Sequence, residues 1–409
     1  MNFKPFAFIR SLGPGLLFAG AAIGVSHLVQ STRAGADFGF GLIWALLLVN
    51  IFKYPFFQFG PRYTSATGES LIDGYLKLGK GVLIAYFLLT FLTMFTIQAA
   101  VTIVTAGLAS NLFGFTSNLI IWSIIITIFS LLILLIGRYK VLDNLMKIII
   151  LILSISSIIA VIIAIKNSNF QLDFKQVLPE GSVEIGFLIA FLGWMPAPLD
   201  ISVWQSLWAV EKKKEVHQNY DRKRSLYDFN IGYFATIFLG ICFVSLGALV
   251  MFNSEEEFSG SAGKFAQQLI GLYTKNLGVG TSIFISIAAF ATMFSTTLTT
   301  LDASPRAMAK STELITNKNS KNIYLFWIFL LAAGTIIILS FFITNMKFMV
   351  KIATILSFLT APFYAIANYI LVTSKHTPID FHPSKGLRIL SYFGIVFLIG
   401  FSIWYLNNL

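Results

Sequence analysis

An imidazole within an apolar stretch is the first group in this sequence that could bind a ligand. Residues 13–28 are long enough to cross a bilayer, yet Gly24, Ser26 and His27 interrupt their centre. A helix in lipid gains nothing from such a break, because each freed backbone group lacks a partner there. An ionisable residue at this depth is a candidate functional group, although a lone histidine can also simply hydrogen-bond a neighbouring helix.

A second interruption lies at residues 193–200, where Met195 and Asp200 flank two prolines. The Met195 thioether and the His27 imidazole are both suitable ligands for first-row transition metals. Asp200 either supplies a carboxylate or caps the half-helix that follows it. Paired breaks of this kind mark the substrate site in transporters. We therefore predict a midplane site with His27, Met195 and Asp200 as metal ligands.

Other groups near the two breaks complete the predicted site. Unwound carbonyl groups around Ile23 and Trp194 would add hard oxygen ligands. Polar side chains on neighbouring segments are candidate wall groups, with interhelical hydrogen bonding as their alternative role. The predicted substrate-binding residues are Gly24, Ser26, His27, Gln30, Gln98, Trp194, Met195, Ala197, Asp200 and Thr360.

The composition is that of a polytopic membrane protein. Of 409 residues, 56% are hydrophobic and only 11% are charged, whereas soluble domains carry about 25% charge. The net charge of +11 is attributed to cytoplasmic loops rather than to nucleic-acid binding. The single cysteine, Cys242, rules out an internal disulfide and a multi-cysteine metal site. No cofactor motif, HExxH helix or nucleophile elbow is present, so an enzyme is not expected.

Eleven apolar runs approach the roughly 20 residues that a spanning helix needs. They fall at about 13–35, 38–60, 82–108, 117–137, 142–165, 185–209, 230–252, 279–303, 323–344, 348–373 and 387–406. The first and the sixth are the broken ones. Five spans per repeat require the second repeat to enter from the opposite side, so an inverted repeat is predicted. It comprises 1–165 and 185–373, with 387–406 as an extra helix of one transmembrane domain.

The distribution of basic residues predicts the orientation. With a cytoplasmic N-terminus, the cytoplasmic loops and adjoining segment ends hold 21 of the 29 Lys and Arg, against seven on the other side. This bias predicts a multi-pass protein of the plasma (inner) membrane with an external C-terminus. Lipid and a small transported solute are the expected partners. A monomer is compatible with the sequence.

Several short motifs resemble those of one transporter family. They are Gly-Pro-Gly-Leu-Leu at 13–17, the run at 34–40, Leu-Ile-Trp at 42–44, Thr-Gly at 67–68, Met-Pro at 195–196 and the Ser/Thr-rich run at 295–300. In this order they resemble the NRAMP family of divalent metal transporters, and the resemblance covers all eleven segments. It implies a LeuT-like, all-α fold of 5+5 inverted repeats plus one helix, with helices 1 and 6 broken.

The sequence departs from this family at its metal site. Gly24 and His27 stand where the family has its metal-binding Asp and Asn, and Ala197 stands where the family has a His after Met-Pro. Family members carry their proton-coupling charges on the third and ninth helices. The corresponding segments here, 82–108 and 323–344, contain no charged residue. The resemblance thus predicts a transporter of divalent transition metals (Mn or Fe) that lacks the family's proton network.

The loss of the aspartate leaves a second cargo open. A dication in the membrane interior needs compensating negative charge, because an unpaired ion there is very costly. With Gly24 in that position the site is neutral, or positive if His27 is protonated. A small anion such as bicarbonate, or another small polar solute, is therefore the alternative cargo. A receptor or structural role would show no substrate flux.

Overall fold

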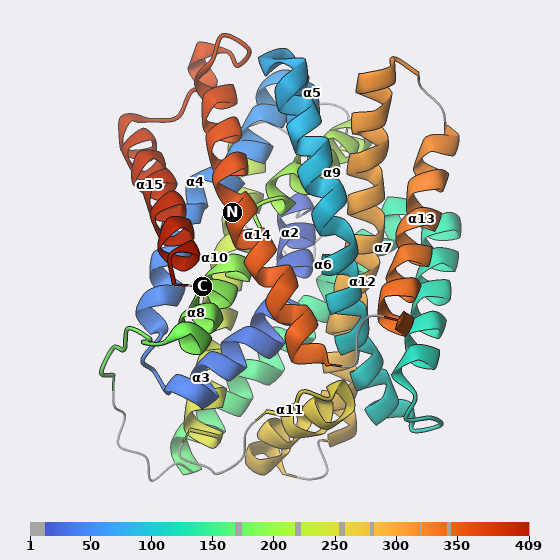
Figure 1. Ribbon diagram of the computed structural model, residues 1–409, viewed down its shortest axis with the longest axis vertical. Coiled ribbons are helices and arrows are strands. Elements are labelled where there is room, and N and C mark those ends of the chain that lie inside the picture. The colour runs from blue at the N-terminus through green and yellow to red at the C-terminus, as the bar shows by residue number, and fades with distance from the viewer. Residues whose placement is uncertain are drawn as a thin grey trace, which may run out of the picture.

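The computed structural model describes residues 13–167, 174–216, 222–252, 258–278, 282–318, 321–341 and 345–408, and within these it forms a helical bundle without strands (Figure 1). This confirms the predicted all-α class. The longer helices are α4 (Ile43–Thr67), α6 (Lys80–Phe113), α7 (Leu119–Asn167), α10 (Arg222–Val250), α12 (Ser282–Thr316), α13 (Lys321–Phe341), α14 (Met346–Thr373) and α15 (Lys385–Leu406).

Both predicted breaks are present. The first span is divided into α2 (Pro14–Ala22), the π-helix η1 (Ser26–Ser31) and α3 (Thr32–Phe38), and its two parts are bent by 46°. The sixth is divided into α8 (Ser182–Trp194) and α9 (Ile201–Val216). Within the described ranges, eight helices are long and apolar enough to cross a membrane, or nine with the bent first pair. The second arm of α7 and the α8–α9 pair account for the remaining predicted segments.

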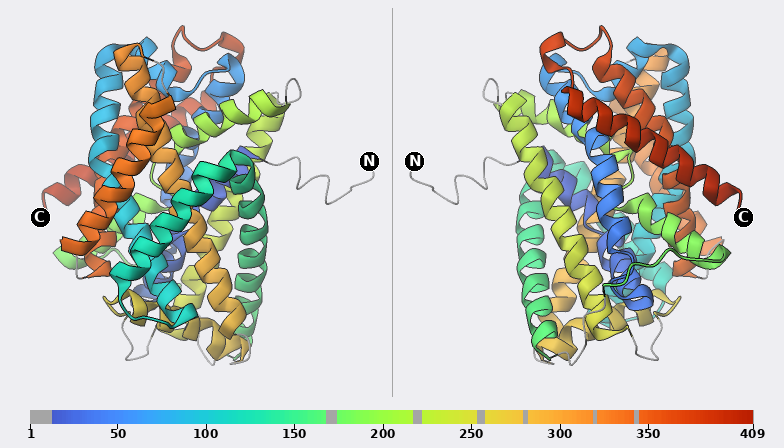
Figure 2. Two further views of the ribbon diagram at one scale, coloured as in Figure 1. Left: turned by 90° about the vertical axis from the view of Figure 1, so that its right-hand side faces the viewer. Right: turned by 90° about the vertical axis from the view of Figure 1, so that its left-hand side faces the viewer.

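Helix α7 differs from the prediction, which had two separate spans at 117–137 and 142–165. Its helical backbone runs without interruption over 49 residues. At 1.5 Å per residue a straight helix of this length would measure about 74 Å, more than twice the hydrocarbon thickness of about 30 Å. The helix is instead bent between its two apolar arms, as Figure 2 shows. The two crossings are therefore joined by helix rather than by a loop.

Two further helices were not predicted. Helix α5 (Leu71–Leu78) begins with a capping box between Ser70 and Asp73. Helix α11 (Ala262–Leu277) is amphipathic rather than uniformly apolar, so a search for spanning segments passes over it. The two lie at opposite ends of the bundle (Figure 1).

Helix α10 supports both halves of the first broken span, and glycines bring the backbones into contact. A Cβ atom added to Gly15 would lie 2.0 Å from the Asp228 carbonyl oxygen, and one on Gly232 would lie 2.0 Å from the Gly15 oxygen. One on Gly35 would likewise lie 2.0 Å from the Val244 oxygen. Small residues permit such close packing of membrane helices. The order of these contacts shows that α2 and α3 run parallel to α10.

Asp228 of α10 also caps the start of α2. Its carboxylate oxygens accept hydrogen bonds from the backbone N–H groups of Gly13 (3.1 Å) and Gly15 (2.9 Å), and the side chain is buried. The first N–H groups of a helix have no partner within the helix, and the helix dipole favours an anion there. The sequence distance of more than 200 residues makes this a tertiary cap.

We expect Asp228→Ala to lower the free energy of unfolding by about 2 kcal/mol, the upper range for loss of a helix cap. Asp228→Asn keeps one acceptor and should lose less. Thermal denaturation of the purified protein in detergent would measure both. Equal melting temperatures for the alanine variant and the unsubstituted protein would contradict the capping role.

The second broken span is held by α4 and α14. A Cβ on Gly193 would lie 2.2 Å from the Thr354 carbonyl oxygen of α14, and one on Gly60 of α4 would lie 2.5 Å from the Ser202 oxygen of α9. The two halves thus contact different neighbours closely. This leaves residues 195–200 as the unwound segment between them.

Candidate functional site

The first break is shaped by the absence of a side chain at Gly24. A Cβ atom there would lie 2.5 Å from Thr296 Oγ1 and 2.8 Å from its Cγ2, so α12 approaches the unwound backbone directly. Thr296 Oγ1 in turn lies within hydrogen-bond distance of the Gly20 (3.3 Å) and Ile23 (3.4 Å) carbonyl oxygens. Its single hydrogen is also within reach of the Thr292 oxygen at 3.2 Å, so the Ile23 oxygen, predicted as a cargo ligand, competes with two other acceptors for it.

The second break exposes carbonyl groups because two prolines follow the end of α8. Pro196 has no N–H group, so the Leu192 carbonyl lacks its usual helical donor. The last helical carbonyls of any helix need partners from outside it. Here the partner is a lysine of α4: Lys53 Nζ lies 2.7 Å from the oxygen of Leu192 and 2.8 Å from that of Gly193.

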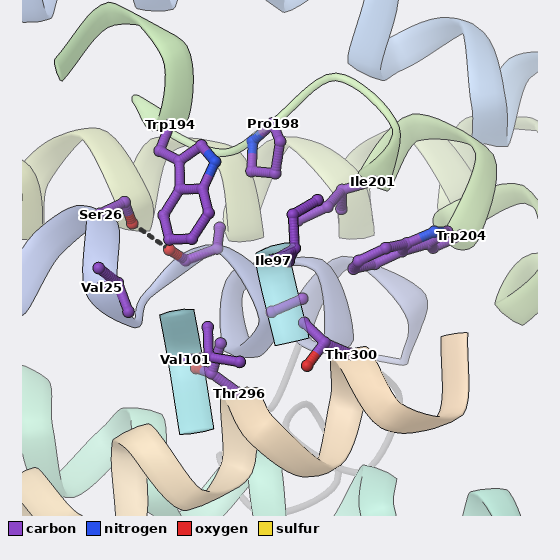
Figure 3. A pocket seen from close by; sticks show the side chains of 12 residues that line it. Val25, Ser26, Ile97, Val101, Trp194, Pro198, Ile201, Trp204, Thr296 and Thr300 are labelled. Atoms are coloured by element: carbon purple, nitrogen blue, oxygen red, sulfur yellow. Dashed lines mark hydrogen bonds between the residues drawn. The ribbon is translucent and has the colours of Figure 1, made fainter. Parts of the chain in front are cut away.

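A small cavity lies between the two breaks. Its volume is about 20 Å³, and a cavity of about 10–15 Å³ can hold one water molecule. Figure 3 shows Trp194 and Pro198 of the second break on one side and Thr296 and Thr300 of α12 across from them. The remaining lining residues are Ala21, Ala22, Val25, Ser26, Ile97, Val101, Ile201 and Trp204. The wall is mostly apolar, with three hydroxyl groups.

His27 does not line this cavity. It is fully buried, and its Nε2 lies 2.9 Å from the Thr236 carbonyl oxygen of α10. Its Nδ1 lies 2.7 Å from Ser26 Oγ and 3.2 Å from the Ala22 oxygen. The Thr236 carbonyl oxygen only accepts, so Nε2 must carry a proton to bond with it, and both ring nitrogens then have protein partners. Ser26, which also donates to the Ala22 oxygen, does line the cavity.

Met195 faces the same helix as His27. A Cβ added to Gly240 would lie 3.6 Å from Met195 Sδ, and Gly240 is one helical turn beyond Thr236, on the same face of α10. The structure thus directs two of the three predicted metal ligands toward α10. Neither side chain is among the cavity-lining residues.

Asp200 has different neighbours. It is buried, its Oδ1 atom has no hydrogen-bond partner, and it interacts electrostatically with Lys53, Tyr86 and Tyr364. Lys53 and Asp200 are both described, yet no direct ion pair joins them. In the described ranges no group of three His, Cys, Asp or Glu residues is placed to hold a metal ion.

The other predicted residues occupy varied positions. Trp194 lines the cavity and donates from Nε1 to Ser357 Oγ at 2.8 Å. Gln98 links α6 to α12, accepting from Thr300 Oγ1 at 2.6 Å. Thr360 bonds to carbonyl oxygens of its own helix. Gln30 is buried, and its Oε1 atom has no partner. The Ala197 carbonyl oxygen lies 3.3 Å from Lys53 Nζ.

Sequence reasoning missed Lys53, Trp204, Thr296 and Thr300 as site residues. A signal for Lys53 was present, since it is a lone charge within the apolar run 38–60, and ionisable residues inside membrane segments are functional candidates. The two threonines belong to the Ser/Thr-rich run at 295–300, which served only as a motif of the family.

Helix α9 connects the cavity to a larger opening. Its residues Ile201 and Trp204 line the cavity, while Leu207, Val210 and Glu211 line a space of about 530 Å³ between α5, α9, α12 and α13. We name this space the α9 vestibule. Its other walls carry charged residues, including Glu69, Asp73, Arg306, Lys310 and Glu313.

Buried polar atoms without partners lie along the same helix and at the residue directly before it. They include Asp200 Oδ1, Trp204 Nε1, Trp208 Nε1 and both amide atoms of Gln205. The first three residues are spaced by four and share one face of α9. A buried polar atom without a partner costs about 1–3 kcal/mol. Buried polar atoms of this kind are normally satisfied by ordered water or by a bound group.

One family model and one curated relative each match almost the whole chain. The family model described as natural resistance-associated macrophage protein-like (Nramp) matches residues 15–408. An uncharacterized protein of Pasteurella multocida is 36% identical over 403 residues, covering 97% of this chain and 92% of that protein.

Two solved structures share the fold. A variant of the Eremococcus coleocola manganese transporter has a TM-score of 0.74 at 12% identity, covering 99% of this chain and 87% of that one. MhsT in complex with L-phenylalanine has a TM-score of 0.66 at 15% identity, covering 95% and 98%. The LeuT-like fold predicted from the sequence is therefore confirmed.

Proposed function

Because the chain belongs to the Nramp family, and is thus a multi-pass membrane transporter, we propose that its cargo binds in the cavity between the two helix breaks. The observation that carries this proposal is the composition of the cavity wall. Ala22 and Val25 adjoin the first break, and Trp194 and Pro198 come from the second, so the wall is built from both. A change in either break alters the space available to the cargo.

The α9 vestibule would be the exit toward one side of the membrane. If the N-terminus is cytoplasmic, the vestibule opens to the cytoplasm, because α9 runs from the midplane toward the basic segment at 212–214. The row of unpaired polar atoms on α9 would then line the route between cavity and vestibule. The protein would lie in the plasma (inner) membrane with its C-terminus outside.

For the cargo, we favour a small polar solute with at most one charge. The three hydroxyl-bearing wall residues are Ser26, Thr296 and Thr300, and the cavity wall contains no ionisable side chain. The nearby charges of Lys53 and Asp200 sum to zero if both groups are ionised. A dication would enter this neutral, low-dielectric space without compensation, at a cost that an uncharged or singly charged solute avoids in large part.

A divalent transition metal (Mn or Fe) is the second candidate, and membership of the Nramp family favours it. It would require His27 and Met195 to turn from α10 into the cavity. In either case we propose transport without the family's proton network, since residues 82–108 and 323–344 carry no charge.

Flux into proteoliposomes tests the proposal and separates the cargoes. Mn²⁺, Fe²⁺, Mg²⁺ and bicarbonate should be assayed in parallel, with protein-free liposomes as the control. We expect bicarbonate uptake that saturates, and no saturable uptake of the three metals. Saturable Mn²⁺ or Fe²⁺ uptake that His27→Ala and Met195→Ala both reduce would establish the metal candidate instead. A rate that depends steeply on a pH gradient would contradict the absence of proton coupling.

A further inference from the structure

The Lys53 side chain ends in a cage of backbone oxygens at the second break. Lys53 lies in the middle of α4 and is fully buried. Its Nζ atom lies 2.7 Å from the oxygen of Leu192 and 2.8 Å from that of Gly193. The oxygens of Met195 and Ala197 follow at 3.1 and 3.3 Å. We name these four carbonyl groups the oxygen cage.

The cage has the chemistry of a cation site. All four hydrogen-bond partners of Nζ are carbonyl oxygens, which only accept. A neutral amine would turn its lone pair toward one of these oxygens, whereas an ammonium presents three N–H donors and no acceptor. The cage also lies at the C-terminal end of α8, where the helix dipole favours positive charge. Unwound carbonyls at such ends coordinate cations in transporters with broken helices.

We propose that Lys53 is a built-in cation. Its ammonium group occupies the oxygen cage permanently, holds the second break in its unwound form and excludes dissociable metal or monovalent ions from it. This deepens the proposed function, on which it rests, because it explains how a broken helix can be maintained without a bound ion. It makes Lys53 a positioning and specificity-determining residue of the transport site.

The proposal predicts a cation site in a variant that lacks the side chain. Lys53→Ala removes the amine and leaves empty the space that its side chain occupied up to the cage. A cation about the size of an ammonium group should therefore enter. Ammonium, methylammonium and K⁺ fit this description, and choline is too large. Lys53→Met removes the charge but fills the same space, so it should be destabilised without being rescued by ions.

Thermal melting of the full chain in detergent, with chloride salts of these cations, tests this without knowledge of the cargo. For Lys53→Ala in choline chloride we expect a melting temperature lower by about 4 °C. Methylammonium at about 100 times its Kd should raise it by about 3 °C. The unsubstituted protein and Lys53→Met should respond equally to all salts. The matched control is Lys351→Ala, whose side chain lies beside Gly186 at the other end of α8.

Two melting results would overturn the proposal, and one aggregation result would do so as well. One is a Lys53→Ala protein whose melting temperature is the same in methylammonium, ammonium, K⁺ and choline. The other is saturable stabilisation of the unsubstituted protein by one of these cations that Lys53→Met abolishes. If Lys53→Ala aggregates in choline, its recovery in methylammonium supports the proposal, and aggregation in both salts contradicts it. A failure of all fluxes in proteoliposomes would leave these melting results unchanged, so the two proposals fail separately.

Discussion

Transport by a Gly24→Ala variant is expected to fall by about tenfold to hundredfold. The new methyl group would lie 2.5 Å from Thr296 Oγ1, so α12 and the first break must move apart. Overpacking of this kind costs about 1–3 kcal/mol. If this free-energy cost raises only one conformational state of the transport cycle, the transport rate falls by about tenfold for each 1.4 kcal/mol. The wall of the cavity would be displaced at both Val25 and Thr296.

Initial rates of flux of the cargo found in the proteoliposome panel would measure the loss. Adding Thr296→Ala to Gly24→Ala removes the hydroxyl and methyl groups that collide, and we expect it to restore part of the rate. Gly400→Ala on α15 is the matched control, because a Cβ there meets nothing within 4 Å. Unchanged flux in Gly24→Ala would show that close contact with Thr296 is unnecessary for transport.

The second large effect is expected on stability, from Asp200→Asn. This change removes the buried negative charge that interacts with Lys53 while keeping the shape of the side chain. At an effective dielectric constant of about 20, two unit charges about 4 Å apart attract by about 4 kcal/mol, and charges farther apart attract by less. We expect a loss of about 2–3 kcal/mol, or about 3 °C in melting temperature for a chain of this length.

A double-mutant cycle isolates this interaction from other effects. Asp200→Asn combined with Lys53→Met should be less destabilised than the sum of the two single variants, with a coupling of about 2 kcal/mol. Glu184→Gln, at the exposed start of α8, should show no coupling with Lys53→Met. If the Asp200 and Lys53 effects simply add, then the site does not depend on its charge balance.

The spans and both breaks could be predicted from the sequence. The bilayer sets the length of a span, and residues that interrupt an apolar helix mark a break. Segment length follows from hydrocarbon thickness, and Gly24 and Pro196 interrupt the apolar runs where the structure has its unwound segments. Helix α11 escaped prediction because an amphipathic helix at the end of the bundle has no such requirement. The joined arms of α7 escaped it because hydropathy locates crossings and gives no information about whether the chain between them is helical.

The side-chain directions within the site could not be predicted. His27, Met195 and Asp200 lie at the breaks, as expected, but their neighbours depend on how the two broken spans rotate against α10 and α4. The first two meet Thr236 and Gly240, more than 40 residues away in sequence. For Lys53, in contrast, the sequence alone indicates that the side chain has a polar partner, because a charged group within an apolar run needs one. Which carbonyls form that partner depends on tertiary packing.

Helix α10 fixes the angle between the two halves of the first broken span. It is a single rod of 29 residues, and α2 is fixed near its beginning by Asp228 and Gly232 while α3 is fixed near its end at Val244. Because α2 and α3 are both attached to the same straight helix, the angle between them cannot change unless one of these attachments opens. Rocking during a transport cycle would therefore carry α2, η1 and α3 together with α10. Spin labels on α3 and on the end of α10 should keep one separation with and without cargo.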